Sequence, residues 1–405
     1  MQSDWRQVIF NIKNSTGYDL IYDSKKAIHG RFETDPPGEI KNGETLSFKV
    51  NKNDLGSTIG PEGYVRYKLA LINNLTMELT FTWNHPQGSA KSAYTVYSNP
   101  PNCSSGTQTP PSPIGHNQQI TLEVFVHDLD KVYDIRAWMK SLNSSISLAD
   151  INIPGTHDSG ARFGGAPYEA QKWTIAEQLE YGIRFLDIRL KPNEGELNGA
   201  DFRVFHNDAD QNLKFKEVVD ACWTYLTKHD EEAIIMLINQ EKSNNGGFGK
   251  ALETYIEKRN EQFYTKNDIP TLGTVRKKIV LLRRYTGALG FHCKDWPHNS
   301  AGWIHAEQMY VQDYYKVSAT WLQQKWGKVT ETMERARSSP GAYIQNYTSG
   351  STGLNPIDVA KNINARLYQE FSHTSRRKFG IMIMDFPDEF GGQIIPLIIT
   401  TNSLS

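Results

Sequence analysis

Residues 184–190 read RFLDIRL, a run in which aliphatic and charged side chains alternate. Successive side chains of a β-strand point to opposite faces of the sheet. The aliphatic side chains would therefore pack against helices on one face, while Asp187 and Arg189 would point together to the opposite face. The pattern predicts a strand that is covered by helices and that contributes to a polar site.

Strand-like segments recur beyond residue 130, and segments with helical periodicity lie between them. The predicted helices are residues 135–142, 174–182, 215–229, 251–263 and 356–371. The predicted strands are residues 184–190, 233–239, 278–285, 309–315 and 380–387. Strands that alternate with helices over about 270 residues are typical of a parallel α/β barrel.

Residues 1–130 have an all-β character, with turns that are rich in glycine, proline and asparagine. The predicted strands are residues 8–14, 45–51, 65–72, 77–83, 93–98 and 120–128. This pattern predicts a β-sandwich. Residues 98–119 are rich in proline and serine, and they are predicted to form a long surface loop before the last strand. We therefore divide the chain into an all-β domain, residues 1–130, and an α/β domain, residues 131–405.

The composition fits a folded protein of two domains and argues against one class of partner. The chain has 405 residues, a length that exceeds what one ordinary hydrophobic core accommodates. Of these residues, 38% are hydrophobic and 22% are charged, as in folded proteins. Its formal net charge of -1 provides no electrostatic basis for binding nucleic acid. The three cysteines, Cys103, Cys222 and Cys293, match no metal-ligand spacing, and a single disulfide among them stays open.

Polar side chains lie near the ends of several predicted strands. Each could be a solvated strand end, but burying an unpaired charge is costly, and the active sites of parallel α/β barrels lie at the carboxyl ends of the strands. The combination predicts one shared pocket. Its expected members are His157, Asp158, Asp187, Arg189, His206, Arg284, Asp313, Tyr315 and Asp385.

This set of side chains suits the cleavage of a phosphodiester. The sequence has no P-loop, no dinucleotide fingerprint and no nucleophile elbow around a serine. One imidazole would remove a proton from an attacking hydroxyl, and the other would donate a proton to the leaving oxygen. A guanidinium would neutralise charge on the phosphate, and a carboxylate beside each histidine would set its tautomer.

Five separated motifs carry a resemblance to a known family. They are NIPGTHDSGA (152–161), RFLDIRL (184–190), KIVLLRRYTG (278–287), YVQDYYKV (310–317) and IMIMDF (381–386). Over residues 131–405 the chain resembles bacterial-type phosphatidylinositol-specific phospholipase C. The resemblance implies a distorted, incompletely closed (β/α)8 TIM-like barrel that works without a metal ion or other cofactor. It also implies that the inositol 2-hydroxyl attacks the phosphodiester of phosphatidylinositol, or of a GPI anchor, to give diacylglycerol and inositol 1,2-cyclic phosphate.

The resemblance implies a catalytic role for five of the polar residues. His157 matches the general base, and Asp385 matches the carboxylate that orients it. His206 matches the general acid, which Asp158 would support. Arg189 matches the arginine that binds the phosphate and takes the place of a metal ion.

The remaining four residues match the part of the family's pocket that binds the inositol ring. Tyr315 would stack on the ring, and the charged groups would bind its hydroxyls; the matching residues are Asp187, Arg284, Asp313 and Tyr315. One departure concerns a lysine that the family often carries after the strand at residues 233–239. Asn239 or Gln240 takes its place here, which leaves the headgroup preference open.

Residues 1–130 show a second resemblance, to the aegerolysin type of lipid-binding β-sandwich. It is carried by VIFNIKNSTG (8–17) and by TFTWNHPQGSAKSAYTV (80–96). The resemblance implies a domain that binds membrane lipid, and Trp83, Tyr94 and Tyr97 are the candidate interface residues. The alternative is a sandwich with a purely structural role.

These expectations place the protein at a membrane surface outside the cell, bound peripherally to phosphatidylinositol or a GPI anchor. Five Asn-X-Ser/Thr sequons agree with secretion. The amino-terminal residues show no signal peptide, so a cytoplasmic origin stays open.

Two other functions fit part of the pattern. A metal-dependent phosphodiesterase of the glycerophosphodiesterase or sphingomyelinase D type would need a cluster of acidic ligands near His157, where Arg189 is expected instead. A lipid-binding toxin component without enzymatic activity would need no intact catalytic set.

Overall fold

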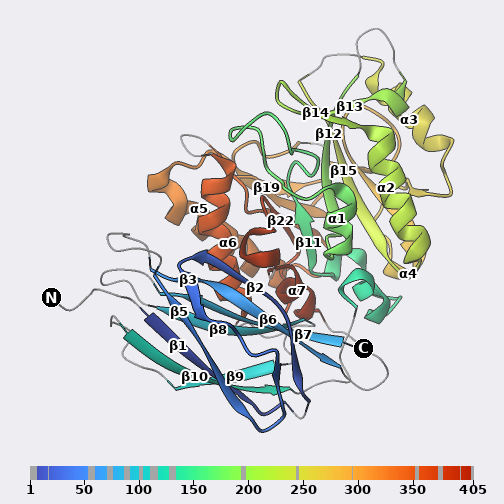
Figure 1. Cartoon of the computed structure of the whole chain (residues 1–405). Helices are drawn as coiled ribbons and strands as arrows, with labels where there is room; N and C mark the ends of the chain where they lie inside the picture. The colour runs from blue at the N-terminus through green and yellow to red at the C-terminus, as the bar shows by residue number, and fades with distance from the viewer. Residues whose placement is uncertain are drawn as a thin grey trace. The chain divides into compact units, whose positions relative to one another are not determined.

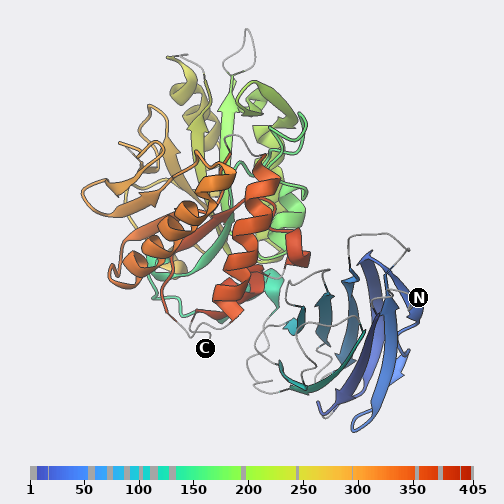
Figure 2. The same cartoon turned by 90° about the vertical axis from the view of Figure 1, so that its left-hand side faces the viewer.

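The computed structural model describes most of the chain. The described residues are 7–16, 18–52, 60–70, 76–85, 92–99, 104–109, 117–126, 134–192, 198–242, 246–293, 295–351, 355–372, 377–392 and 394–402. The chain divides into two compact units, Met1–Val132 and Tyr133–Ser405. Figures 1 and 2 draw both units in two views, and each unit has a hydrophobic core of its own.

The first unit consists of strands in its described residues. They are β1 (Gln7–Asn14), β2 (Leu20–His29), β3 (Arg31–Thr34), β4 (Glu39–Ile40), β5 (Thr45–Asn51), β6 (Glu62–Ala70), β7 (Thr76–Asn84), β8 (Ala93–Asn99), β9 (Ser104–Thr109) and β10 (Asn117–Val126). Two five-stranded sheets result, with the orders β3-β5-β1-β10-β9 and β4-β2-β6-β7-β8. Every second side chain of β1 is buried, and the buried side chains of both sheets join one core.

The core of the first unit contains one of the residues that was expected at a membrane interface. Trp83 is 2% exposed, and its ring lies 5.1 Å from that of Phe10 and 5.6 Å from that of Phe32. The prediction that Trp83 is an interface residue is therefore wrong, because the two sheets enclose it. Tyr94 and Tyr97 are half-buried.

One strand lies in the segment that was predicted to be a surface loop. β9 runs antiparallel to β10 at the edge of its sheet. Its sequence, SSGTQT, has no alternation of apolar and polar residues, so the strand depends on its pairing with β10 rather than on a local pattern. Cys103 lies outside the described residues, whereas Cys222 and Cys293 are buried free thiols.

The second unit mixes strands and helices. Its strands are β11 (Ile153–Thr156), β12 (Phe185–Lys191), β13 (Arg203–His206), β14 (Ala209–Lys214), β15 (Ala233–Gln240), β16 (Phe263–Tyr264), β17 (Lys278–Arg284), β18 (Phe291–His292), β19 (Ala301–Ile304), β20 (Met309–Gln312), β21 (Tyr343–Tyr347) and β22 (Ile381–Met384). Its α-helices are α1 (Ile175–Glu180), α2 (Phe215–Lys228), α3 (Phe248–Glu257), α4 (Leu272–Val275), α5 (Leu322–Arg337), α6 (Pro356–Ser372) and α7 (Ile394–Thr400). Short 3-10 helices are η3 (Ile135–Ser141), η4 (Leu148–Asp150), η5 (Gly199–Asp201), η6 (Ala319–Trp321) and η7 (Glu389–Gly392).

The strands of the second unit form one curled sheet that stays open. Its path is β16-β17-β15-β12-β11-β22-β21-β20-β19, and all neighbours in it are parallel except β19 and β20. No ladder within the described residues joins the two ends of this path. The unit is therefore a mixed α/β fold with a curled sheet, and it falls short of the closed ring of a (β/α)8 barrel.

The opening coincides with a missing helix. An α-helix lies between most consecutive parallel strands, but the described residues between β17 and β20 contain only the short strands β18 and β19. Helices α5 and α6 follow on the other side of the opening. They pack against each other, and α5 packs on β20 and β21, as Figure 2 shows with these helices in orange and red.

Several predicted boundaries differ from those found. The predicted helix at residues 135–142 is the 3-10 helix η3, with Ala137 outside the helical region of backbone angles. β20 ends at Gln312, so Asp313 and Tyr315 follow the strand rather than belong to it. The strand β21 and the helix α5 were not predicted. None of the described helices is long and apolar enough to cross a membrane.

Candidate active site

A cavity of about 940 Å³ lies at the carboxyl ends of the parallel strands of the second unit. Six of the nine predicted site residues line it; they are His157, Arg189, His206, Arg284, Asp313 and Tyr315. The other three lie beneath its surface and are almost inaccessible; they are Asp158, Asp187 and Asp385. The fold therefore brings cationic and imidazole groups to the cavity and places carboxylates behind them.

His157 follows β11 directly and is oriented by a carboxylate from the neighbouring strand. β11 pairs in parallel with β22, with Thr156 opposite Met384, so the residues that follow both strands meet. His157 Nδ1 lies 2.8 Å from Asp385 Oδ1. This contact holds the proton of the neutral ring on Nδ1 and leaves Nε2 as the nitrogen that can accept a proton.

Arg189 lies at the centre of the acidic residues. Its Nε is 2.7 Å from Asp158 Oδ1, and its terminal nitrogen is 3.4 Å from Asp187 Oδ2. The same terminal nitrogen lies 2.7 Å from His157 Nε2. The two carboxylates hold the guanidinium beside the base, where it can bind an anion in the cavity.

The surroundings of His157 favour opposite protonation states. Burial lowers the pKa of His157, but the charges of Asp385 and Asp158 outweigh burial and raise it to about 9. The contact with Arg189 instead requires the neutral ring, since two N–H donors cannot share a hydrogen bond. The geometry seen here is thus that of the neutral base, and a proton gained on Nε2 would face Asp158 Oδ2 at 3.3 Å.

His206 ends β13 and approaches the same carboxylate from the other side. Its Nδ1 lies 2.8 Å from the carbonyl oxygen of Tyr168, to which it donates because a carbonyl can only accept. Its Nε2 lies 3.5 Å from Asp158 Oδ2, and its ring centroid is 6.5 Å from that of His157. The contact of Nδ1 with Tyr168 leaves Nε2 facing Asp158 and the space between the two rings, where it can donate a proton to a bound group.

Asp158 contacts Arg189, His157 and His206, and its backbone has an unusual conformation. Burial raises the pKa of Asp158, but the charges of Arg189 and the two histidines outweigh burial and lower it. Its φ of +41° lies in the left-handed region, as do the φ angles of Asn207 and Phe386, which follow His206 and Asp385. Strained backbone of this kind is maintained only where the surrounding structure holds it, often at functional sites.

Trp296 organises the side of the cavity away from the histidines. The guanidinium of Arg284 stacks on its ring at 3.7 Å, and its Nε1 donates a hydrogen bond to Asp313 Oδ2 at 2.8 Å. Trp296 therefore fixes two predicted substrate-binding residues, although the sequence analysis missed it. Its partners are distant in the sequence, so no local pattern could have identified it.

The end of β15 and the two residues that follow it contain the position at which the resemblance led us to expect a lysine. Asn239, Gln240, Glu241 and Lys242 all line the cavity. Glu241 is 6% exposed, and burial raises its pKa in spite of the nearby charge of Arg189. An amide side chain at this position, followed by a largely buried carboxyl group, offers a headgroup other hydrogen-bond partners than a lysine would.

Three residues have the spacing of metal ligands, but a guanidinium group already lies between them. Ligand atoms of His157, Asp158 and Asp187 lie within 4.8 Å of one another. The guanidinium of Arg189 contacts all three residues. A divalent cation would have to displace a charged group that these carboxylates already bind, so the three residues do not fit a resident metal ion.

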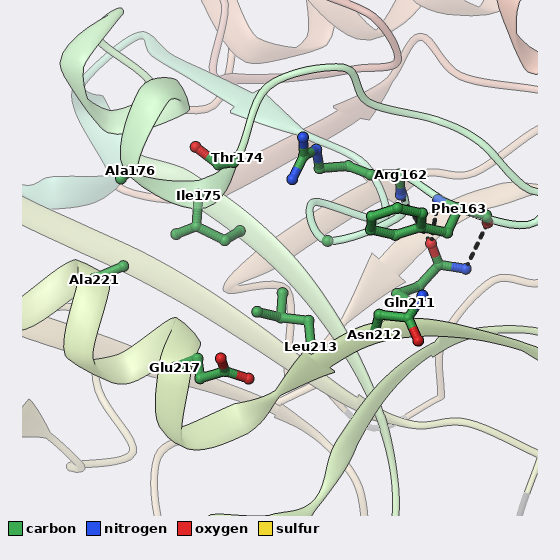
Figure 3. A pocket seen from close by; sticks show the side chains of 11 residues that line it. Arg162, Phe163, Thr174, Ile175, Ala176, Gln211, Asn212, Leu213, Glu217 and Ala221 are labelled. Carbon is green, nitrogen blue, oxygen red and sulfur yellow. Dashed lines mark hydrogen bonds between the residues drawn. The ribbon is translucent and has the colours of Figure 1, made fainter.

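A second cavity of about 170 Å³ contains none of the predicted residues. Figure 3 shows it between α1, α2 and β14, with Ile175, Leu213 and Ala221 on its apolar side. Gln211 accepts hydrogen bonds from the backbone N–H groups of Arg162 and Phe163 at 2.8 Å. This glutamine thereby holds the loop that follows Asp158.

Comparisons with known proteins show that the chain is similar to enzymes named 1-phosphatidylinositol phosphodiesterase. Residues 144–282 match the family model described as PI-PLC X 1. The 1-phosphatidylinositol phosphodiesterase of Listeria monocytogenes serovar 1/2a is 29% identical over 290 residues, which cover 67% of this chain and 86% of that protein. The protein of the same name from Staphylococcus aureus strain Newman is 24% identical over 279 residues, which cover 62% of this chain and 87% of that protein.

Solved structures give the same relationship. The phosphatidylinositol-specific phospholipase C of Listeria monocytogenes has a TM-score of 0.57 at 25% identity, and the match covers 67% of this chain and 100% of that chain. A structure of the Staphylococcus aureus enzyme, which concerns the modulation of its membrane binding, has a TM-score of 0.59 at 23% identity and covers 67% of this chain and 98% of that one.

Proposed function

We propose that this chain, whose second unit is a relative of the bacterial phosphatidylinositol-specific phospholipases C, is itself a phospholipase C that cleaves phosphatidylinositol. The observation that carries the proposal is the convergence of His157, Arg189 and His206 on one cavity, each held by a buried carboxylate. GPI anchors, which contain the same phosphodiester, are a second substrate class for this site.

The first half of the reaction uses the base and the arginine. His157 Nε2 removes the proton of the inositol 2-hydroxyl, and the oxygen forms a bond to phosphorus. Asp385 stabilises the imidazolium that results, through its contact with Nδ1 at 2.8 Å. Arg189 moves from His157 to the phosphate and neutralises the charge that develops on its oxygens.

The second half releases diacylglycerol. The bond between phosphorus and the diacylglycerol oxygen breaks, and His206 Nε2 donates a proton to that oxygen. Asp158 Oδ2 lies 3.5 Å from the Nε2 atom that donates this proton. Inositol 1,2-cyclic phosphate remains, and a proton passes back from His157 to His206 through solvent before the next turnover.

The wall formed by Trp296 would bind the inositol ring. Arg284 and Asp313 are fixed by Trp296 and would bind ring hydroxyls, while the Tyr315 ring lines the same cavity and would stack on the sugar. Asp187 would act through Arg189, because it is fully buried beneath that residue. Headgroup preference would depend on Asn239 and Glu241.

The reaction would need no metal ion. The guanidinium of Arg189 occupies the position that a cation would take between His157, Asp158 and Asp187, and it can supply the positive charge itself. A metal-dependent phosphodiesterase is therefore the weaker alternative, and a non-enzymatic lipid-binding protein would not need this arrangement.

The first unit would hold the enzyme at its substrate. A lipid-binding β-sandwich would keep the second unit near the membrane and raise its effective concentration there. The protein would then act at a membrane surface outside the cell, as a peripheral partner of phosphatidylinositol.

The test is phosphorus NMR of phosphatidylinositol vesicles incubated with the full chain and excess EDTA. We expect the signal of inositol 1,2-cyclic phosphate to appear in EDTA and to be absent with His157→Ala. His229→Ala is the matched control, because His229 follows α2, outside the residues that line the cavity; it should turn over at the wild-type rate.

Two outcomes would overturn parts of the proposal. Product that forms only with added calcium or magnesium would contradict the role given to Arg189. No product from phosphatidylinositol or from a GPI-anchored protein, in either condition, would leave a lipid-binding protein.

A further inference from the structure

Lys325 is a charged residue on the buried face of a helix, where apolar side chains are usual. It lies on α5 and is 2% exposed. The buried side of this helix consists of Lys325, Val329, Thr332, Met333 and Ala336, which follow the spacing of a helix face that packs on a sheet. The ammonium group therefore points into the interior of the second unit, outside the residues that line the cavity.

The ammonium group uses all its donors on neutral acceptors. Lys325 Nζ donates to the carbonyl oxygens of Tyr314 and Tyr347 at 2.7 and 2.5 Å. It also lies 3.3 Å from Gln312 Oε1. No ion pair involves Lys325 in the described part of the chain. Three hydrogen bonds to fixed oxygens define the position of the group fully.

Stability alone does not account for a lysine at this position. Burial lowers the pKa of Lys325 to about 7, although the charges of Asp313 and Asp385 act in the opposite direction. A buried charge with only neutral partners is costly, and an apolar side chain of similar volume would be easier to bury. The contacts of Lys325 therefore point to a purpose other than packing.

Those contacts converge on the segment that follows β20. Tyr314 stands between Asp313 and Tyr315, which line the cavity. Gln312 Oε1 accepts a hydrogen bond from the backbone N–H of Tyr314 at 2.8 Å, so Gln312 and Lys325 together bind the backbone N–H and the carbonyl oxygen of Tyr314. The orientation of the side chains on either side of Tyr314 depends on this anchoring.

The third contact reaches the other wall of the cavity. Tyr347 ends β21, and its carbonyl also accepts from Gln312 Nε2 at 2.8 Å. Its buried ring lies edge-on to the His157 ring at 5.9 Å and to the Trp296 ring at 5.8 Å. Lys325 thus ties the strand end that carries Tyr347 to the segment that carries Asp313.

We propose that Lys325 is a positioning residue for headgroup recognition, which fixes Asp313 and Tyr315 through the carboxyl ends of β20 and β21. The inference rests on the proposed function, since it assigns Lys325 to the same reaction. Lys325 touches neither substrate nor reacting atoms, so its loss acts on binding of the ring more than on the chemical step.

The test compares Lys325→Met with wild type on phosphatidylinositol, together with competition by free myo-inositol. We expect KM and the inhibition constant of myo-inositol to rise about tenfold, the equivalent of one or two lost hydrogen bonds. The value of kcat should change less than KM, because His157, Arg189 and His206 keep their carboxylates.

Lys378→Met is the matched control. Lys378 Nζ donates to the carbonyls of Ser339 and Ala342 and to Asp150, and so it ties strands together at their amino ends, away from the cavity. Its loss should lower the thermal midpoint of unfolding without raising the inhibition constant of myo-inositol. If Lys325→Met does not fold, Gln312→Met removes the same anchor on the Tyr314 peptide and should raise KM in the same way.

The outcomes separate this inference from the proposed function. A wild-type chain without turnover would overturn the function. A wild-type chain with turnover, and folded Lys325→Met or Gln312→Met with unchanged KM and inhibition constant, would overturn the positioning role. An equal rise of KM in Lys378→Met would also overturn it, because the effect would then follow from general destabilisation.

Discussion

The two ring nitrogens of His157 have different neighbours, so Nδ1 orients the ring and Nε2 is left for the reaction. Asp385 binds Nδ1, and Arg189 and Asp158 face Nε2. A carboxylate on Nδ1 fixes the tautomer and raises the basicity of the other nitrogen. The neutral amide of an asparagine could keep the contact but would remove the charge.

Asp385→Asn should therefore retain the fold and lose most of the catalysis. We expect kcat to fall by about 10²–10⁴-fold, which is the contribution that general acid–base catalysis usually makes to a reaction rate. The rising limb of kcat/KM should move to lower pH, because the charge that raises the pKa of His157 is gone. Steady-state kinetics from acid to alkaline pH checks both effects, and an unchanged pH profile would contradict the role of Asp385.

The same charge links stability to pH. Burial lowers the pKa of His157, but Asp385 and Asp158 raise it overall to about 9 in the folded chain, against about 6.5 in an unfolded one. The stabilisation is fully present below about pH 6.5 and is lost as the pH rises through about 9. We expect the advantage of wild type over Asp385→Asn in the free energy of unfolding to shrink by up to about 3 kcal/mol over this range.

Urea unfolding of both proteins at several pH values measures that difference. A difference that stays constant from acid to alkaline pH would show that His157 does not titrate between the two states as described.

At the scale of elements, the site depends on clamps between strand ends. Gln171 Nε2 donates to the carbonyl oxygens of His157 at 2.7 Å and Met384 at 3.0 Å. Asn364 on α6 donates to the carbonyls of Asp385 and Phe386 at 3.0 and 3.1 Å. These amides hold the ends of β11 and β22 so that the base and its carboxylate stay in contact.

Gln171→Leu should lower both stability and turnover. The substitution leaves the carbonyl oxygen of His157 without a donor, which costs about 1–3 kcal/mol. The carbonyl oxygen of Met384 keeps only the backbone N–H of His157, so the contact between His157 and Asp385 loosens. Gln211→Leu is the control, because Gln211 is similarly buried and holds the backbone of Arg162 and Phe163 instead. Denaturant unfolding should show a similar loss for both variants, while kcat should fall several-fold more in Gln171→Leu. Equal kcat values in the two would contradict the clamp.

Two of the elements that the sequence analysis missed, β21 and α5, have polar residues that face inward. All five residues of β21 are buried, among them Gln345 and Asn346, and α5 buries Lys325. A pattern of apolar residues cannot reveal such elements. Asn346 is satisfied by Gln312 and by the carbonyl of Val329, and these partners come from other elements of the fold.

At the scale of the whole molecule, each of the two units has a hydrophobic core of its own. The core of the first unit uses residues up to Val124, and that of the second begins at Trp138. Units with separate cores can fold alone. The catalytic cavity is lined only by residues of the second unit.

A chain reduced to residues 133–405 should therefore keep its catalytic activity and bind membranes more weakly. We expect turnover of a dispersed short-chain phosphatidylinositol within about twofold of the full chain. Turnover on vesicles should fall by about 10²-fold or more if the first unit supplies a second lipid contact. Vesicle sedimentation of both chains checks the binding. Equal activity of both chains on vesicles would assign the first unit a structural role.

The sequence by itself determined what local chemistry can determine in this protein. Alternating side chains predicted β1, β5, β7 and β12, and short apolar runs predicted β15 and β17. The types of the polar residues near the strand ends indicated a phosphodiester as substrate. Such patterns act over a few residues, where strand and helix geometry leave few choices. The motif order then identified the family to which the second unit is related.

Only the tertiary structure decided which groups meet. It placed Arg189 between Asp158 and His157, brought Trp296 to Arg284 and Asp313, and joined Lys325 to the segment that follows β20. These contacts join residues that are far apart in the chain, and each exists because packing of whole elements satisfies buried charges and amides. No local pattern contains that information, since the partners of each buried polar group come from other strands and helices.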